Sequence, residues 1–147
     1  MTTYDYTKQV GHLLRRAYQR HVAIFQQIIP DEQLTAAQYV TLCALLEKQP
    51  CSLNDLVRAT AIDQGTARGV VERLAVRNLI VVRPDEMDKR KVLISLTEAG
   101  ERLVKEMQTY GQDISDITMS SLNPAERVAL IYLLSKISEP GKEGPPN

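Results

Sequence analysis

The chain has 147 residues, of which 44% are hydrophobic and 24% charged, which suits one compact domain with a proper core. Eighteen basic residues balance eighteen acidic ones, which excludes a uniformly basic nucleic-acid-coating protein and an acidic solvating tail. Two cysteines, Cys43 and Cys51, cannot form a disulfide framework, and neither a signal-peptide pattern nor an apolar run of roughly 20 residues occurs. We therefore expect a cytoplasmic protein without a membrane span.

The first half of the chain predicts two amphipathic helices. Apolar residues recur at helical spacing from Lys8 to Ile29. Thr35 and Gln38 have the spacing of a capping box, and the helix they open runs to about Lys48. The polar side of the first helix is strongly basic and carries Lys8, His12, Arg15, Arg16 and Arg20.

Two short helices and a hairpin follow. Ser52 can cap a helix that ends near Thr60, and Asp63 can cap a fourth helix. The β-branched stretches 79–82 and 92–96 are separated by a charged run, which predicts a β-hairpin with a charged tip.

The last part of the chain predicts long helices again. A helix of about 20 residues, roughly 30 Å long, is expected from Thr97. Asn123 and Pro124 open a final helix that is apolar almost all round from Val128 to Leu134. The expected fold class is mainly α with a small β-hairpin (α+β). We divide it into an N-terminal helix (1–34), a helix-turn-helix with hairpin (35–97), C-terminal helices (98–138) and a disordered tail (139–147).

Catalytic chemistry finds little support in this sequence. No H-E-x-x-H, G-x-S-x-G, G-x-G-x-x-G or P-loop pattern occurs, and no Cys/His cluster has the spacing of zinc ligands. We expect no catalytic residue, no metal, no cofactor and no enzymatic activity. Cys43 falls on the apolar side of its helix with Tyr39 and Leu46, which favours an inert thiol over a redox sensor.

Charge is polarised along the chain. Residues 58–91 hold eight basic and five acidic side chains, a net charge of +3, whereas residues 92–147 carry a net charge of −3. Two short helices followed by a hairpin with a cationic tip are typical of a winged helix-turn-helix, whose second helix enters the major groove of DNA. Phosphate contacts from the wing would fix its register on the duplex.

The same segment carries a family resemblance. Residues 88–100 read DKRKVLISLTEAG and fill every fixed position of D-x-R-x-x-x-[hydrophobic]-x-L-T-x-x-G, so the segment resembles the wing signature of MarR-family transcriptional regulators. LTAAQY at 34–39, GVVERL at 69–74 and NLIVVR at 78–83 are similar to the family's second helix, recognition helix and first wing strand. The resemblance covers about residues 8–138 and is closest to the branch that controls aromatic-acid breakdown.

The resemblance implies a homodimeric repressor that leaves a palindromic DNA operator when a small molecule, often an anionic phenolic compound, binds between the DNA-reading and dimerisation parts. The terminal helices would form the dimer, because they carry more apolar surface than one winged domain can cover. The predicted 30 Å helix is comparable with the roughly 34–36 Å between half-sites one DNA turn apart. A winged-helix module that binds proteins, without operator or effector, is the alternative.

The DNA-contacting candidates lie on the fourth helix and the wing. Arg90 can enter an A·T-rich minor groove while Asp88 orients it, although Asp88 can also be a simple turn former. Arg73 can instead pair with Glu72 or Asp63, and the base-reading group can instead be a solvated helix face. The base-reading candidates are Gln64, Thr66, Arg68 and Gly69, and the phosphate contacts are Arg73, Arg77, Arg83, Lys89 and Lys91.

Effector candidates come from the first two helices. His21 lies on the apolar stripe, where it is either a ligand contact or a hydrogen-bonded interface residue. Tyr18 and Tyr39 could flank an aromatic acid. Its carboxylate could meet Arg16 or Arg20. With His12 and Arg15 added, the cationic sector also suits the phosphates of an aromatic acyl-CoA, so both the free acid and the thioester are candidate inducers.

Overall fold

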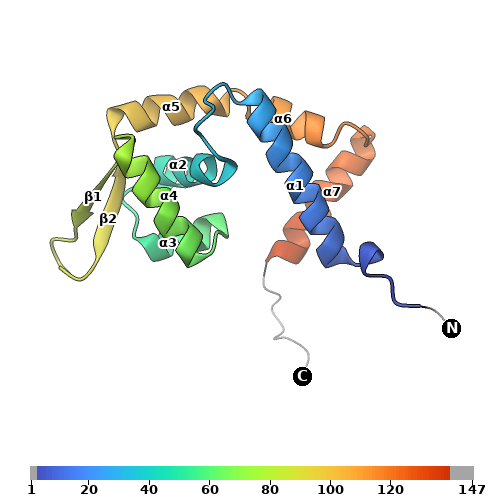
Figure 1. Cartoon of the computed structure of the whole chain (residues 1–147), viewed down its shortest axis with the longest axis horizontal. Coiled ribbons are helices and arrows are strands. Elements are labelled where there is room, and N and C mark those ends of the chain that lie inside the picture. The colour runs from blue at the N-terminus through green and yellow to red at the C-terminus, as the bar shows by residue number, and fades with distance from the viewer. Residues whose placement is uncertain (1–2, 140–147) are drawn as a thin grey trace.

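The computed structural model describes residues 3–139 (Figure 1), so the predicted tail lies outside the described residues except for Glu139. The described part is mainly helical with one two-stranded antiparallel sheet, which confirms the predicted fold class. The elements are a 3-10 turn (Tyr6–Lys8), α1 (Val10–Ile28), α2 (Ala36–Lys48), α3 (Leu53–Thr60), α4 (Gln64–Val76), β1 (Ile80–Pro84), β2 (Val92–Leu96), α5 (Glu98–Gln108), α6 (Gly111–Thr118) and α7 (Pro124–Ser138).

Helices α2, α3 and α4 pack with the hairpin into a winged helix-turn-helix. The hairpin pairs Ile80 with Leu96 and Pro84 with Val92, and Cys51 adds two backbone hydrogen bonds to Ile94. The core of this half consists of fully buried aliphatic side chains: Leu42, Leu45, Leu56, Leu74 and Ile94.

The predicted helix starts are confirmed by their hydrogen bonds. Thr35 and Gln38 form a complete capping box, as do Ser52 with Asp55 and Asn123 with Glu126. The side chains of Asp63 and Thr97 cap α4 and α5.

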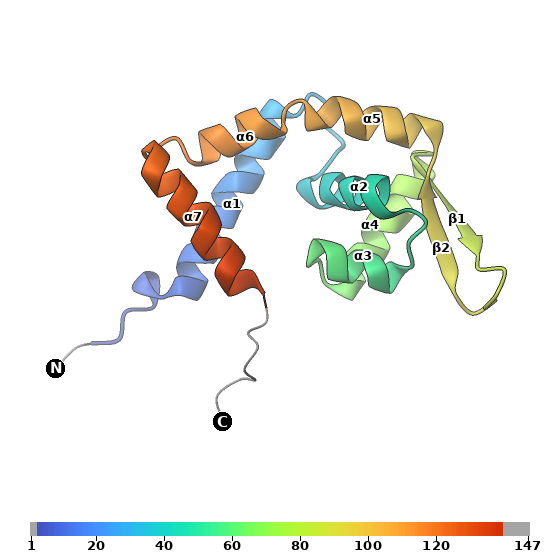
Figure 2. The same cartoon turned by 180° about the vertical axis from the view of Figure 1, so that it is seen from behind.

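The single long helix predicted from Thr97 is wrong, because the chain breaks it into α5 and α6 at Thr109 and Tyr110. The Thr109 hydroxyl donates to the carbonyl of Glu106 at 2.6 Å, and Gly111, a poor helix former, opens α6. The two helices form a bent arch over the molecule instead of a 30 Å rod (Figures 1 and 2).

Hydrogen bonds of the Thr97 hydroxyl, which we call the Thr97 clasp, join the start of α5 to the turn between α4 and β1. The Thr97 hydroxyl donates to the carbonyl of Asn78 at 2.7 Å and accepts from the backbone N–H of Gly100 at 3.0 Å. A Cβ on Gly100 would lie 2.0 Å from the carbonyl oxygen of Leu79, so only glycine fits there. The L-T-x-x-G part of the wing signature is therefore structural.

Helices α1, α6 and α7 form the other half of the molecule, where α1 packs against α6 (Figure 2). None of the residues of α7 is buried, although the helix is rich in large apolar side chains. Val128 is 73% exposed, and Val10 on α1 is 65% exposed. Among the described residues, no helix combines the length and the apolar character that a membrane crossing needs.

Candidate nucleic-acid interface and cavity

The N-terminal half of α4 presents an exposed face. Gln64 and Arg68 extend from it into solvent, as predicted for side chains that reach base edges. A Cβ on Gly69 would meet nothing within 4 Å, so no packing contact requires glycine at this position. The absence of a side chain there leaves the helix surface flat, which suits close approach of a DNA backbone.

Asp63 holds the start of this helix. Its Oδ1 accepts the backbone N–H of Thr66 at 2.9 Å, and its Oδ2 accepts the Thr66 hydroxyl at 2.7 Å. These two bonds lower the pKa of Asp63, so its carboxyl group is ionised at neutral pH. The Thr66 hydroxyl is therefore already engaged in the free protein.

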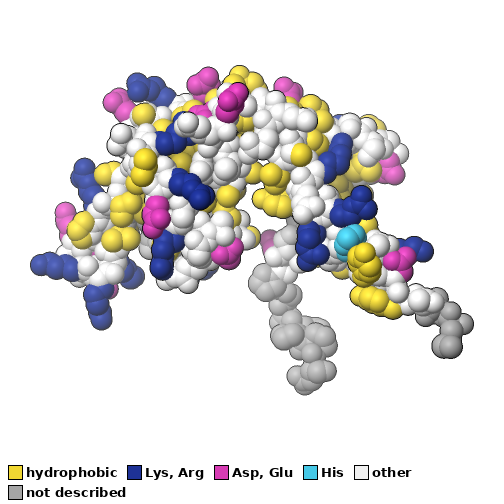
Figure 3. Space-filling model, viewed as in Figure 1, with side chains coloured by type: hydrophobic (Ala, Val, Ile, Leu, Met, Phe, Trp, Pro, Cys, Tyr) yellow, Lys and Arg dark blue, Asp and Glu magenta, His cyan; other side chains and the backbone are white. Residues whose placement is uncertain are grey.

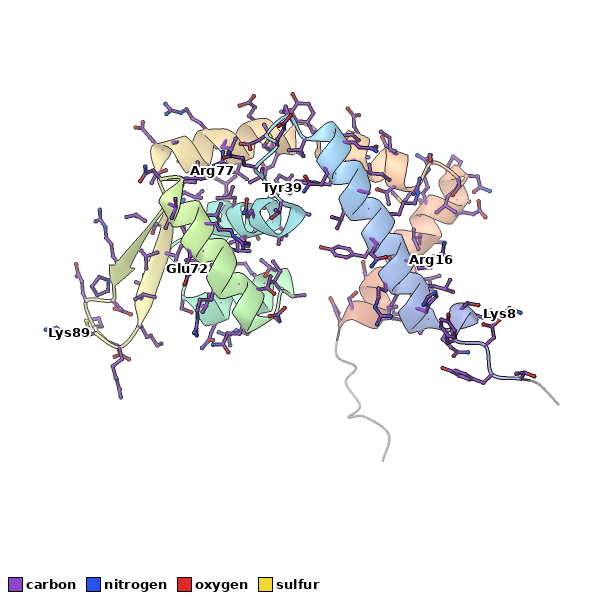
Figure 4. The ribbon with its side chains drawn as sticks, in the orientation of Figure 1. Lys8, Arg16, Tyr39, Glu72, Arg77 and Lys89 are labelled. Atoms are coloured by element: carbon purple, nitrogen blue, oxygen red, sulfur yellow. The ribbon has the colours of Figure 1, made fainter. Side chains whose placement is uncertain are left out.

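Arg77 does not fit the predicted phosphate contact. Its Nη2 donates to Asp31 Oδ2 at 2.7 Å, and only 27% of the Arg77 side chain and 17% of the Asp31 side chain are exposed. It lies at the C-terminal end of α4, as Figure 4 shows, and ties that end to the loop before α2. Arg73 remains exposed, and within the described chain it forms no ion pair with Glu72 or Asp63.

Asp88 holds the wing tip, which carries exposed Lys and Arg side chains. Asp88 Oδ1 accepts the backbone N–H of Arg90 at 3.1 Å and lies 3.5 Å from its Nε, so Asp88 both forms the turn and orients the guanidinium. Arg83, Lys89 and Lys91 are exposed around it. Figure 3 shows Lys and Arg side chains gathered at this tip, where Figure 4 labels Lys89.

A cavity of about 890 Å³ lies between the two halves of the molecule. Its walls come from α1, from the start of α2, from the turn between α3 and α4, and from α6. Tyr18, His21 and Tyr39, all predicted effector contacts, line it, and Figure 4 shows Tyr39 near the start of α2, on the side toward α1. Phe25 adds an aromatic wall, with its ring centroid 5.4 Å from that of Tyr39.

The hydrogen bonds around His21 define its neutral tautomer. Its Nδ1 lies 2.9 Å from the hydroxyl of Thr118, and that hydroxyl donates its hydrogen to the carbonyl of Ile114 at 2.8 Å. Nδ1 must therefore donate, which leaves Nε2 as an acceptor on the neutral ring. Burial, together with nearby Cys43, raises the pKa of Tyr39 to about 12, so its hydroxyl stays neutral at physiological pH.

The other three predicted effector contacts do not line the cavity. Arg20 donates to the carbonyl of Thr118 at 2.7 Å and holds the end of α6 instead. The His12 ring packs edge-on against Tyr6, 5.2 Å between centroids, and Arg16 lies on α1 away from the lining (Figure 4). Among the described residues that line the cavity there is no lysine or arginine.

Sequence reasoning missed the part of the cavity wall that comes from the α3–α4 turn and α6. The sequence predicts Asp63 only as a helix cap and places Gly111 inside a continuous helix. The cavity is assembled from four segments far apart in the chain, so no local spacing could have indicated it. The missed lining residues are Phe25, Ala36, Ala37, Val40, Thr60, Ala61, Ile62, Asp63, Thr66, Gly111, Gln112, Ile114 and Ser115.

The fold combines an exposed helix α4, a cationic wing and a cavity beside the start of α4. Together these features define a winged helix-turn-helix regulator. The MarR family model matches residues 32–91. The HTH-type transcriptional repressor NicR of Pseudomonas putida is 55% identical over 136 residues, which cover 92% of this chain and 86% of the relative. The chain therefore belongs to the MarR family.

Solved structures agree with this assignment. The structure described as "Mechanism for regulation of DNA binding of Bordetella bronchiseptica BpsR by 6-hydroxynicotinic acid" matches with a TM-score of 0.86 and 59% identity, covering 94% of this chain and 99% of that one. The Streptomyces coelicolor PcaV regulator with its natural ligand matches with a TM-score of 0.83 and 25% identity, covering 94% and 97%. The chain is thus a transcriptional regulator of the MarR family.

Proposed function

We propose that this chain is a homodimeric repressor that leaves a palindromic operator when a hydroxylated aromatic acid of the nicotinate type binds in its cavity. The observation that carries the proposal is the position of that cavity, which touches both α1 and Asp63 at the start of α4. The BpsR relative, whose DNA binding is regulated by 6-hydroxynicotinic acid, supports the ligand class. A repressor of chromosomal operators works in the cytoplasm, as the sequence predicts.

The DNA-binding surface is formed by α4 and the wing. Gln64, Arg68 and Thr66 would read bases, with Gly69 allowing close approach. Arg90, oriented by Asp88, would enter the minor groove. Arg77 is excluded from this surface by its ion pair, and the phosphate contacts are Arg73, Arg83, Lys89 and Lys91.

A second copy of the chain would cover the exposed apolar side chains of α1 and α7. Surface helices of a monomer rarely leave such a stripe in water. Two-fold pairing through these helices would present two copies of α4 to successive major grooves. The side chains concerned are Val10, Leu13, Leu14 and Tyr18 on α1, and Val128, Ile131, Tyr132, Leu133 and Ile137 on α7.

The cavity suits a free aromatic acid better than a CoA thioester. Its volume lies within the roughly 300–1,000 Å³ of typical ligand pockets, and its walls are largely apolar and aromatic. The phosphates of a thioester would need cations, but Arg15 and Arg16 lie outside the lining. The neutral Tyr39 hydroxyl can donate a hydrogen bond to a single carboxylate, and His21 can do so when its ring also carries a proton on Nε2.

Ligand binding would act on the DNA-reading helix through the cavity walls. A small molecule shifts a conformational equilibrium only if it binds one arrangement more tightly than the other. A ring held between α1 and the α3–α4 turn contacts both halves at once, so its affinity depends on their relative position. The operator-bound arrangement would be the one that binds the ligand less well.

The proposal is tested by fluorescence anisotropy with a palindromic and a scrambled duplex at several salt concentrations. We expect preference for the palindrome, steep salt dependence, and release by 6-hydroxynicotinic acid but not by a matched aromatic acyl-CoA. Calorimetry would compare the binding of the two compounds directly. A protein with no preference for the palindrome and no response to either compound would instead be a protein-interaction module.

A further inference from the structure

Asp63 has two environments at once. It is the N-cap of α4, with both carboxylate oxygens bonded to Thr66, and it lines the cavity. Among the described lining residues it is the one Asp or Glu, and no lysine or arginine stands beside it there. A permanent negative charge is an unfavourable neighbour for an anionic ligand unless the ligand offers it a hydrogen-bond donor.

We propose that Asp63 recognises the ring hydroxyl, or the ring N–H of its tautomer, on the effector and thereby selects hydroxylated acids over plain ones. This inference rests on the proposed function and names the residue that sets its ligand specificity. His21 comes from α1 and Asp63 from the turn between α3 and α4, and both residues line the cavity. Figure 1 shows α1 on one side of the molecule and the α3–α4 pair on the other. A ligand with its donor at one end of the ring and its carboxylate at the other can donate to Asp63, while its carboxylate accepts from Tyr39 or from His21 protonated on Nε2.

The same contact links ligand recognition to the DNA-reading helix. A carboxylate that turns toward a donor in the cavity can no longer hold Thr66 N and Thr66 Oγ1 at 2.9 and 2.7 Å with unchanged geometry. The hydroxylated ligand therefore competes with the cap of α4. Loss of that cap loosens the first turn, which carries Gln64 and Thr66.

The test compares 6-hydroxynicotinic acid with nicotinic acid on the wild type and on Asp63→Ser. Serine is a good N-cap but is neutral and shorter, so the variant keeps α4 capped without reaching the ligand. We expect the wild type to bind the hydroxylated acid at least about tenfold more tightly, and the variant to lose most of this preference. Asp113→Asn on α6, outside the cavity lining, is the matched control for the change in net charge and should keep the preference.

The outcomes separate this inference from the proposed function. If Asp63→Ser strengthens binding of both acids equally and the preference stays, Asp63 only repels the carboxylate and the inference is overturned. A wild type that binds both acids equally overturns it as well, while release from the operator would still support the proposed function. If neither acid releases the operator, the proposed function itself fails.

Two further measurements guard against misfolding and test the coupling. Asp63→Ser must bind the palindrome without ligand within about threefold of the wild type, since serine keeps the cap. Hydrogen exchange at residues 64–67 should accelerate when 6-hydroxynicotinic acid binds the wild type and should not accelerate with nicotinic acid. Equal protection with both ligands would contradict the competition between ligand and cap.

Discussion

Asp31 Oδ2 accepts a 2.7 Å hydrogen bond from Arg77 Nη2, although the two residues are 46 positions apart. The ion pair joins the loop after α1 to the C-terminal end of α4. Both side chains are largely withdrawn from water, and among the described residues no group accepts a hydrogen bond from the buried Nη1 of Arg77. The recognition helix is thus anchored at both ends, by Asp63 at its start and by Asp31 at its finish.

Asp31→Ala should lower the free energy of unfolding by about 1–3 kcal/mol, because it leaves a partly buried guanidinium without its carboxylate. Urea denaturation followed by circular dichroism measures the change. Glu32→Ala removes a neighbouring, exposed acid and is the matched control. Equal stability of the two variants would show that the pair contributes nothing.

Gly100→Ala should be strongly destabilising, by about 3 kcal/mol or more, since its Cβ would lie 2.0 Å from the carbonyl oxygen of Leu79. The backbone at Leu79 cannot move away from this Cβ without breaking the hydrogen bonds of the Thr97 clasp. Thermal unfolding reports the effect, with Gly11→Ala on α1, where a Cβ meets nothing within 4 Å, as the control. A Gly100→Ala protein as stable as that control would contradict the close approach.

Gly69→Ala separates stability from DNA binding. Alanine should raise stability by roughly 0.5–1 kcal/mol, because glycine is the poorer helix former and the new methyl group meets open space. The same methyl group should weaken operator binding if a DNA backbone approaches this face. Measuring the melting temperature and the operator affinity on one sample separates the two effects. Unchanged affinity would show that the glycine has no role at the DNA.

Arg90→Ala should weaken operator binding more than about tenfold and reduce the salt slope by about one. Anisotropy over a range of salt concentrations gives both quantities. Asp88→Asn keeps an acceptor for the Arg90 N–H but removes the charge beside its guanidinium, so it should show a smaller loss. If Arg90→Ala bound the operator normally, the wing would have no part in recognition.

Leu133→Glu should convert the proposed dimer into single protomers, because it places a charge on the apolar face of α7. Sedimentation equilibrium would then report one chain of 16.5 kDa. Ala99→Glu, an exposed position on α5, is the control and should stay dimeric. A wild type that sediments as one chain at micromolar concentration would remove the proposed dimer.

The helix starts and the hairpin could be predicted because their signals are local. A cap and its partner lie three residues apart, as in Thr35 with Gln38, and the hydrogen bonds between them do not depend on the rest of the chain. The hairpin likewise follows from two β-branched runs around a charged tip. For the same reason Arg90 and Asp88 were placed correctly relative to each other.

The remaining features depend on contacts between distant segments. No residue near Arg77 in the sequence indicates that Arg77 forms an ion pair with Asp31. The sequence alone therefore predicts Arg77 as a phosphate contact. The break at Thr109 was hidden by apolar spacing that continues through it. Arg20 and Arg16 share a helix face with charges suited to an anion, yet the fold turns that face away from the cavity.

The hydrogen bond between Thr97 and Asn78 also limits what the wing signature can indicate about function when it is found in other sequences. Its threonine and glycine are required by the way strand and helix meet, whatever DNA lies beneath. Regulators that share those letters need not share target genes. We expect the sequence specificity of each regulator to depend on positions outside the shared pattern, such as Gln64 and Arg68 in this chain.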